Sequence, residues 1–199
     1  MKERRKGLLW EMALILLTVA ACLYSTGAGN IFGAKVDWSS QHSVFPEYFR
    51  QQFYRTEQFF PEFALNIGGG QNIYNFSYYG LFSPVVLIGY LLPNVKMSDY
   101  MMVASIVCLA AAVIILYRWL KSREFTAAVS GMTALMFLFA GPMIYQSSHQ
   151  IMFVNYMPFL ILAFLFLDQI LDVRKAAKYR FRPHVGLVIS LFFCILHSF

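Results

Sequence analysis

One acid, one amide and one imidazole lie close together in the polar stretch Val36–Phe63, where Asp37 precedes Gln41 and His42 by about one helical turn. A carboxylate can accept a proton from an attacking hydroxyl group, while the amide and the imidazole can hold a second molecule or orient the acid. The same aspartate is also a favoured N-cap for a helix that begins at Trp38. Gln41 and His42 are equally consistent with ordinary polar loop residues. For all three residues, a functional role and a purely structural role both stay open.

Cationic and aromatic residues further along the chain are candidates for binding a ligand. Arg50 and Arg55 suit a phosphate group, although a charged helix face on an anionic lipid surface would carry the same residues. Tyr78 and Tyr79 can stack on a sugar or a lipid, and interfacial aromatic belts contain such pairs as well. Each of these four side chains can therefore be explained either by ligand binding or by its position at the membrane interface.

Further candidates lie much later in the chain. His149 belongs to the short polar segment QSSHQ, between two apolar runs, and can approach the cavity near Asp37. Asn155 and Pro158 follow at the start of the next apolar run, where they either open it to a polar headgroup or mark a kink that neighbouring helices satisfy.

The histidines do not predict a metal site. They lie on different segments, and none has a second histidine three or four residues away; they are His42, His149, His184 and His197. A divalent cation bound jointly by Asp37 and a later loop stays possible, and no other cofactor is expected.

The composition places these residues in a membrane protein, because 59% of the chain is hydrophobic and only 13% is charged. The formal net charge of +6 is explained better by basic flanks beside apolar spans than by nucleic-acid binding. All three cysteines lie inside apolar runs, where a thiol acts as a small hydrophobe and does not report the redox compartment.

Apolar run length predicts the elements that position the polar residues. A spanning helix needs roughly 20 apolar residues, and four runs meet that length: 7–26, 100–120, 127–145 and 151–171. A fifth run, 185–199, stops before a full span is complete, so we expect the sequence to be the first part of a longer protein. The segment 28–98 then forms one large loop. We expect the first run to be an uncleaved helix rather than a signal peptide.

The distribution of basic residues predicts the orientation of the chain. Twelve of the 16 Lys and Arg residues fall in three segments, KERRK, RWLKSR and RKAAKYRFR. If these segments are cytoplasmic, the spans alternate without conflict, the amino terminus is inside, and loop 28–98 is extracytoplasmic. Treating the apolar segment 76–93 as a further span would place two of them outside, so a re-entrant or interfacial segment is the better interpretation.

The loop also contains a predicted amphipathic helix in FPEYFRQQFY, which we expect to lie in the headgroup region with its aromatic face towards the lipid. Its aromatic positions are Phe45, Tyr48, Phe49 and Phe53, opposite Glu47, Arg50 and Gln51. The following NIGGGQNIYNF is typical of a turn or of a close backbone approach.

These segments together resemble the bacterial YfhO family of polytopic membrane proteins. The similarity covers essentially the whole chain and is carried by DWSSQH, by SSHQIMFVNYMPFL and, most specifically, by GGGQN followed by FSYYGLFSP. The last block places Gln71 and Asn72 among the candidate substrate contacts. Many relatives have Asp-Met followed by Gln-Tyr in the loop motif, whereas Trp38 and His42 replace the Met and the Tyr here.

The resemblance implies an all-α, GT-C-like membrane glycosyltransferase that uses a sugar on polyprenyl phosphate. The acceptor would be an extracytoplasmic cell-envelope polymer of the teichoic-acid type, and Asp37 would be the catalytic base. The implied partners are membrane lipids, a cytoplasmic-side donor synthase and a flippase, in the bacterial cytoplasmic membrane. A non-catalytic protein, such as a transporter of lipid-linked sugars or an assembly partner, is the alternative.

Overall fold

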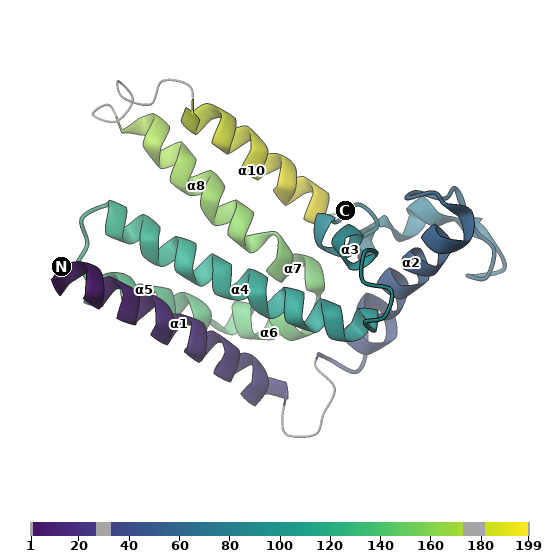
Figure 1. The fold of residues 1–199 in the computed structure, drawn as a ribbon, viewed down its shortest axis with the longest axis horizontal. Helices are drawn as coiled ribbons and strands as arrows, with labels where there is room; N and C mark the ends of the chain where they lie inside the picture. Colours follow the sequence, from purple (N-terminus) through teal and green to yellow (C-terminus); the bar gives the residue numbers. More distant parts are fainter. Residues whose placement is uncertain (1, 27–32, 173–181, 199) are drawn as a thin grey trace.

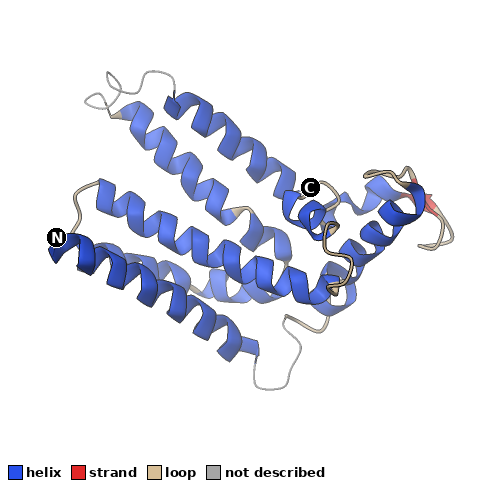
Figure 2. Cartoon of the chain, viewed as in Figure 1, coloured by secondary structure: helices blue, strands red, loops and turns tan. Residues whose placement is uncertain are grey.

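The computed structural model describes residues 2–26, 33–172 and 182–198, and most of them are helical (Figure 2). The elements in chain order are α1 (Lys2–Thr26), the π-helical turn η1 (Trp38–His42), α2 (Val44–Thr56), β1 (Phe63–Ala64), β2 (Gln71–Asn72), the 3-10 helix η2 (Ile73–Tyr79), α3 (Pro84–Gly89), α4 (Met97–Ser122), α5 (Ala127–Leu138), α6 (Gly141–His149), α7 (Ile151–Asn155), α8 (Met157–Leu171) and α10 (Arg182–Ser198).

Three stretches are long and apolar enough to cross a membrane: Lys6–Ser25, Met97–Ser122 and Met152–Leu171. Their outward side chains are mostly apolar, as expected where lipid is the solvent. The prediction of an all-α protein with several membrane spans is confirmed.

The predicted span 127–145 is not one straight helix. It is divided into α5 and α6, which meet at a bend of 54°. Pro142 lies one residue inside α6; it has no amide hydrogen, and its ring clashes with the carbonyl of residue 138 if the helix continues. The α5–α6 pair is therefore a broken span or a re-entrant loop.

The predicted span 151–171 is also interrupted, between α7 and α8. Pro158 removes the hydrogen bond to the Val154 carbonyl, and Tyr156 stands outside both helices. The structure shows the helix break at Pro158. Contact of Asn155 with a polar headgroup stays a prediction.

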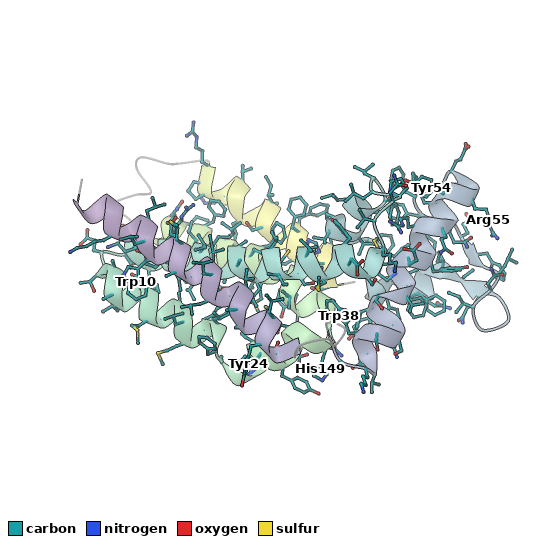
Figure 3. All side chains as sticks on the ribbon, turned by 60° about the horizontal axis from the view of Figure 1, so that its bottom comes forward. Trp10, Tyr24, Trp38, Tyr54, Arg55 and His149 are labelled. Atoms are coloured by element: carbon teal, nitrogen blue, oxygen red, sulfur yellow. The ribbon has the colours of Figure 1, made fainter. Side chains whose placement is uncertain are left out.

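The ends of the helices separate into two groups (Figure 1). The start of α1, the α4–α5 turn, the end of α8 and the start of α10 lie at one end, and α2, α3 and the β1–β2 hairpin lie at the other. The basic segments KERRK and RWLKSR lie at the same end as the start of α1. Most of the third basic segment, RKAAKYRFR, falls outside the described residues. Figure 3 shows the same separation, with Trp10 far from Tyr54 and Arg55.

Ion pairs connect three helices at the end that carries Trp10. Arg118 of α4 donates to both carboxylate oxygens of Glu11 in α1, at 2.8 and 2.7 Å. Arg123 lies 3.4 Å from Asp168 and 3.5 Å from Asp172 at the end of α8. These contacts fix the relative height of α1, α4 and α8, and the bidentate geometry of Arg118 adds direction to the first pair.

The segment 76–93 packs on protein and forms no long helix. Within it, α3 has six residues, and Leu81, Val86 and Tyr90 are fully buried. A Cβ atom on Gly89 would lie 2.8 Å from the side chains of Met97 and Tyr100, so this glycine permits the close approach of α3 to α4.

Candidate functional site

Asp37 precedes η1 and does not act as a helix cap. Its backbone is in the right-handed helical region, at φ −84° and ψ −49°, whereas an N-cap residue is normally extended. Its carboxylate makes no capping hydrogen bond. The capping interpretation offered by the sequence is therefore wrong, and the half-buried acid is available for another role.

Trp38 anchors the turn that carries Asp37. Its side chain is 1% exposed, and its ring lies against Gly33, where any Cβ atom would overlap it. Gly33 has a φ of +92°, a conformation that favours glycine. This contact fixes the start of η1, and Figure 3 shows Trp38 and His149 at the same end of the bundle.

The backbone of η1 is wider than an α-helix. The Ser43 amide donates to the Trp38 carbonyl at 2.9 Å, and the Ser39 amide donates to the Ala34 carbonyl at 3.1 Å. Both bonds span five residues, so the turn contains an extra residue, a feature that occurs often at functional sites. The turn leads directly into α2.

Gln41 and His42 face the two tyrosines at the end of η2. The Tyr79 hydroxyl donates to Gln41 Oε1 at 2.8 Å. The His42 ring lies 5.4 Å from the Tyr79 ring and 6.1 Å from the Tyr78 ring, between centroids. The structure thus brings these four predicted residues together beside Asp37, and we call Asp37, Gln41, His42, Tyr78 and Tyr79 the Asp37 cluster.

Burial controls the electrostatics of the Asp37 cluster. It lowers the pKa of His42 to about 4, although the nearby charge of Asp37 acts in the opposite direction. Burial also raises the pKa of Tyr78, and the charges of Tyr79 and Asp37 add to this increase. At neutral pH the cluster therefore holds a neutral imidazole beside an acid.

One polar atom of the cluster has no partner among the described residues. His42 Nδ1 is buried without a hydrogen bond there. An unsatisfied buried polar atom costs about 1–3 kcal/mol, and such atoms call for an explanation by function or by a bound molecule.

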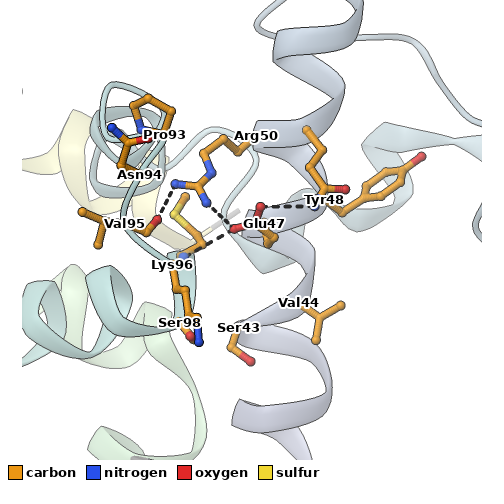
Figure 4. Close-up of a pocket in the computed structure, with 12 residues that line it drawn as sticks. Ser43, Val44, Glu47, Tyr48, Arg50, Pro93, Asn94, Val95, Lys96 and Ser98 are labelled. Carbon is orange, nitrogen blue, oxygen red and sulfur yellow. Dashed lines mark hydrogen bonds and ion pairs between the residues drawn. The ribbon is translucent and has the colours of Figure 1, made fainter.

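Arg50 has a structural role in a different place. Its side chain is 7% exposed, and Nη1 donates to the carbonyls of Leu92 at 2.8 Å and Val95 at 2.7 Å. Nη2 donates to Glu47 Oε2, which also accepts from the Met97 amide at 3.3 Å (Figure 4). The prediction that Arg50 lies on an open charged face is wrong, because the loop before α4 covers it.

A pocket of about 620 Å³ adjoins this ion pair, between α2 and the start of α4 (Figure 4). Its polar lining comes from Ser43, Glu47, Tyr48, Arg50, Gln51, Asn94, Lys96 and Ser98. Sequence reasoning did not find this pocket, because it depends on the return of residues 93–98 onto α2. A smaller pocket beside it also includes Arg55.

The remaining predicted residues lie outside the Asp37 cluster. Gln71 and Asn72 form β2 of the hairpin, and Asn72 Oδ1 accepts from the Tyr74 amide at 2.9 Å as the cap of η2. His149 ends α6, where its ring stacks on Tyr145 with centroids 3.8 Å apart. Asn155 is 1% exposed, and its Oδ1 has no hydrogen-bond partner within the described part of the chain.

Metal-ligating side chains do not gather in the described ranges, where no group of three or more His, Cys, Asp or Glu residues could hold an ion. A cation shared by Asp37 and a later loop stays a prediction.

The long apolar helices define a polytopic all-α membrane protein. Residues 12–192 match the family described as bacterial membrane protein YfhO. The match covers most of the chain, which therefore belongs to the YfhO family, as the sequence resemblance indicated. Comparisons with curated proteins and with solved structures give no match.

Proposed function

We propose that this chain is part of a membrane glycosyltransferase that moves a sugar from polyprenyl phosphate to an extracytoplasmic acceptor in the cell envelope. Membership of the YfhO family suggests this class of enzyme. A teichoic-acid-type polymer is the proposed acceptor, by family analogy. The observation that carries the proposal concerns the Asp37 carboxylate. It caps no helix, and its charge lies close enough to His42 and Tyr78 to influence the pKa of each.

Asp37 is the proposed general base. The acceptor hydroxyl oxygen attacks the anomeric carbon, its proton passes to the Asp37 carboxylate, and the bond between the sugar and the phosphate oxygen breaks with both electrons going to the phosphate. The low pKa of His42 keeps its imidazole neutral at physiological pH, so it does not form an ion pair that would weaken the base.

Gln41 and Tyr79 are the proposed positioning residues. Their hydrogen bond joins η1 to the end of η2, so the two walls of the cluster are held at a fixed separation. A preorganised arrangement of this kind favours the reacting geometry without reorganisation during the reaction. Tyr78, 44% exposed, is the proposed contact for the sugar or the lipid.

The proposed topology places the amino terminus in the cytoplasm and the Asp37 cluster outside. The positive-inside rule supports it, because the first two basic segments lie at the opposite end from the cluster (Figure 1). A donor synthase on the cytoplasmic side and a flippase would supply the lipid-linked sugar.

The test compares the full-length protein with its Asp37→Asn variant in lipid nanodiscs, with polyprenyl-phosphate-linked sugar and purified envelope polymer. Loss of a general base lowers reaction rates roughly 10²- to 10⁴-fold. We therefore expect the rate of sugar transfer by Asp37→Asn to be lower than that of the wild type by a factor of this size. Asp99→Asn is the matched control, because Asp99 is exposed at the start of α4. Unchanged transfer by a folded Asp37→Asn protein would remove Asp37 as the base. Absence of transfer by the wild type, with retained binding of the lipid-linked sugar, would favour the non-catalytic alternative.

A further inference from the structure

The β1–β2 hairpin and the residues next to it expose an unusual number of aromatic side chains. Phe60 is 39% exposed, Phe63 is 51% exposed and Tyr74 is 39% exposed, and Asn72 beside them is exposed as well. We call Phe60, Phe63, Asn72 and Tyr74 the aromatic hairpin face. Exposure near one half is what a ring shows when one of its faces packs on protein and the other is open.

Each ring of this face is held by a defined neighbour. Phe60 and Tyr74 both pack on Phe82, with centroids 5.3 and 5.9 Å away, and the Tyr74 and Phe82 rings are nearly parallel at 11°. Phe63 lies 3.1 Å from the place of a Cβ atom on Gly70, whose φ of +98° favours glycine. The rings are therefore fixed before any ligand arrives, which reduces the entropy lost on binding.

An amide group adjoins one of these rings. Phe63 and Asn72 are direct cross-strand partners in the hairpin, so their side chains lie on one side of it with Cβ atoms about 5 Å apart. Asn72 Oδ1 is used by the Tyr74 amide. Its NH₂ group still offers two donors beside the Phe63 ring.

The segment that carries this face has no basic residue of its own. Residues 56–95, between Arg55 and Lys96, contain no Lys or Arg, and they include the acids Glu57 and Glu62. A surface that binds anionic lipid or a phosphate polymer gathers cations instead. The face therefore suits a neutral ligand that presents apolar C–H groups on one side and hydroxyl groups at its edge.

We propose that the aromatic hairpin face binds neutral hexose units of a glycan. The C–H groups on one side of a sugar ring pack on the electron-rich face of an aromatic ring, and the Asn72 amide binds the hydroxyl groups at its edge.

The position of the face relative to the Asp37 cluster gives the binding its purpose. This purpose rests on the proposed sugar transfer, and it requires an acceptor that contains neutral sugar units as well as any phosphate. Asn72 caps the start of η2, and Tyr78 and Tyr79 end it. Seven residues of 3-10 helix extend roughly 14 Å, so a glycan held by the hairpin reaches the cluster with only a few more sugar units.

The test measures binding without any donor, so it is independent of catalysis. The full-length protein in phosphatidylcholine nanodiscs is titrated with neutral gluco-, galacto- and N-acetylglucosamine oligosaccharides, and saturation-transfer difference NMR detects the bound sugars. We expect binding of at least one series, with Kd raised roughly two- to tenfold by Phe63→Ala or by Tyr74→Ala. Phe125→Ala is the matched control, because Phe125 is 48% exposed and belongs to the α4–α5 turn, which lies at the opposite end of the molecule from the hairpin (Figure 1).

Three results would overturn the proposal. The first is no binding of any neutral oligosaccharide, or equal binding by the wild type and both hairpin variants. The second is strong quenching of a Phe63→Trp variant by brominated lipid, relative to the wild type, which would place the face in the membrane. The third is a concentration-dependent dimer that Phe63→Ala abolishes, which would make the face a contact between two copies. If binding is confirmed while Asp37→Asn leaves transfer unchanged, the hairpin proposal stands and the catalytic proposal fails.

Discussion

The bonding of Arg50 makes a strong prediction about stability. In Arg50→Met, the carbonyls of Leu92 and Val95 lose donors at 2.8 and 2.7 Å, and Glu47 loses its cationic partner. Hydrogen bonds to charged groups contribute about 1.5–3 kcal/mol each. Methionine keeps most of the packing of the arginine stem, so the change isolates the polar contacts.

Two features of the site make the loss of stability in Arg50→Met smaller than the sum of these hydrogen-bond contributions. The Glu47 side chain is 33% exposed, and the adjoining pocket lets water reach the freed carbonyls. Breaking a fully buried ion pair costs about 3–5 kcal/mol, and partial hydration lowers that cost. We therefore expect Arg50→Met to reduce the local stability of residues 92–97 by about 2–4 kcal/mol.

Hydrogen exchange measures this quantity directly. Amide exchange in residues 92–97 of the full-length protein in nanodiscs gives the free energy of local opening. Gln51→Met is the matched control, because Gln51 is exposed on the same helix and contacts Glu47 only at 3.2 Å; a change of less than about 0.5 kcal/mol is expected for it. Equal protection in the two variants would refute the assignment of Arg50 as the residue that holds this loop.

Two further predictions concern pH and topology. The free energy of unfolding should fall by about 3 kcal/mol more in the wild type than in His42→Phe as the pH drops from 6.5 to 4. The reason is that the His42 imidazole of the unfolded chain binds a proton in this pH range, whereas the imidazole of the folded protein, with a pKa of about 4, stays largely neutral. Parallel curves of the thermal unfolding midpoint against pH in the two proteins would contradict this prediction. In a background without native cysteines, Gln51→Cys should react with an impermeant maleimide from outside intact cells, and Ser122→Cys should react only after permeabilisation. The reverse pattern would overturn the proposed orientation.

The sequence predicted the parts of the structure that depend on local composition. Apolar run length located the long helices, because any stretch that crosses hydrocarbon must be apolar and helical. The breaks at Pro142 and Pro158 also have local causes, but a hydropathy window averages over single prolines and missed the first. The candidate residues of the Asp37 cluster could be proposed one by one from their chemistry, without showing that they meet.

The environment of Arg50 could not be predicted in the same way. A helical projection of α2 places Arg50 on the polar side of the helix, and this describes its position on α2 correctly. Its burial depends on Leu92 and Val95, more than 40 residues later in the chain. The same is true of Glu11, whose partner Arg118 lies 107 residues away. Contacts over such separations are fixed by tertiary packing and leave no periodic signal in the sequence.

The extra residue in η1 makes the direction of Asp37 depend on chain length as well as on residue identity. One residue corresponds to about 100° of rotation around a helix. Deletion of Ser40 would let the turn relax into the register of α2, and Asp37 would then point to a different side of the helix while every side chain of the cluster remained in the sequence. The spacing between Asp37 and α2 is therefore as much a part of this site as the carboxylate itself.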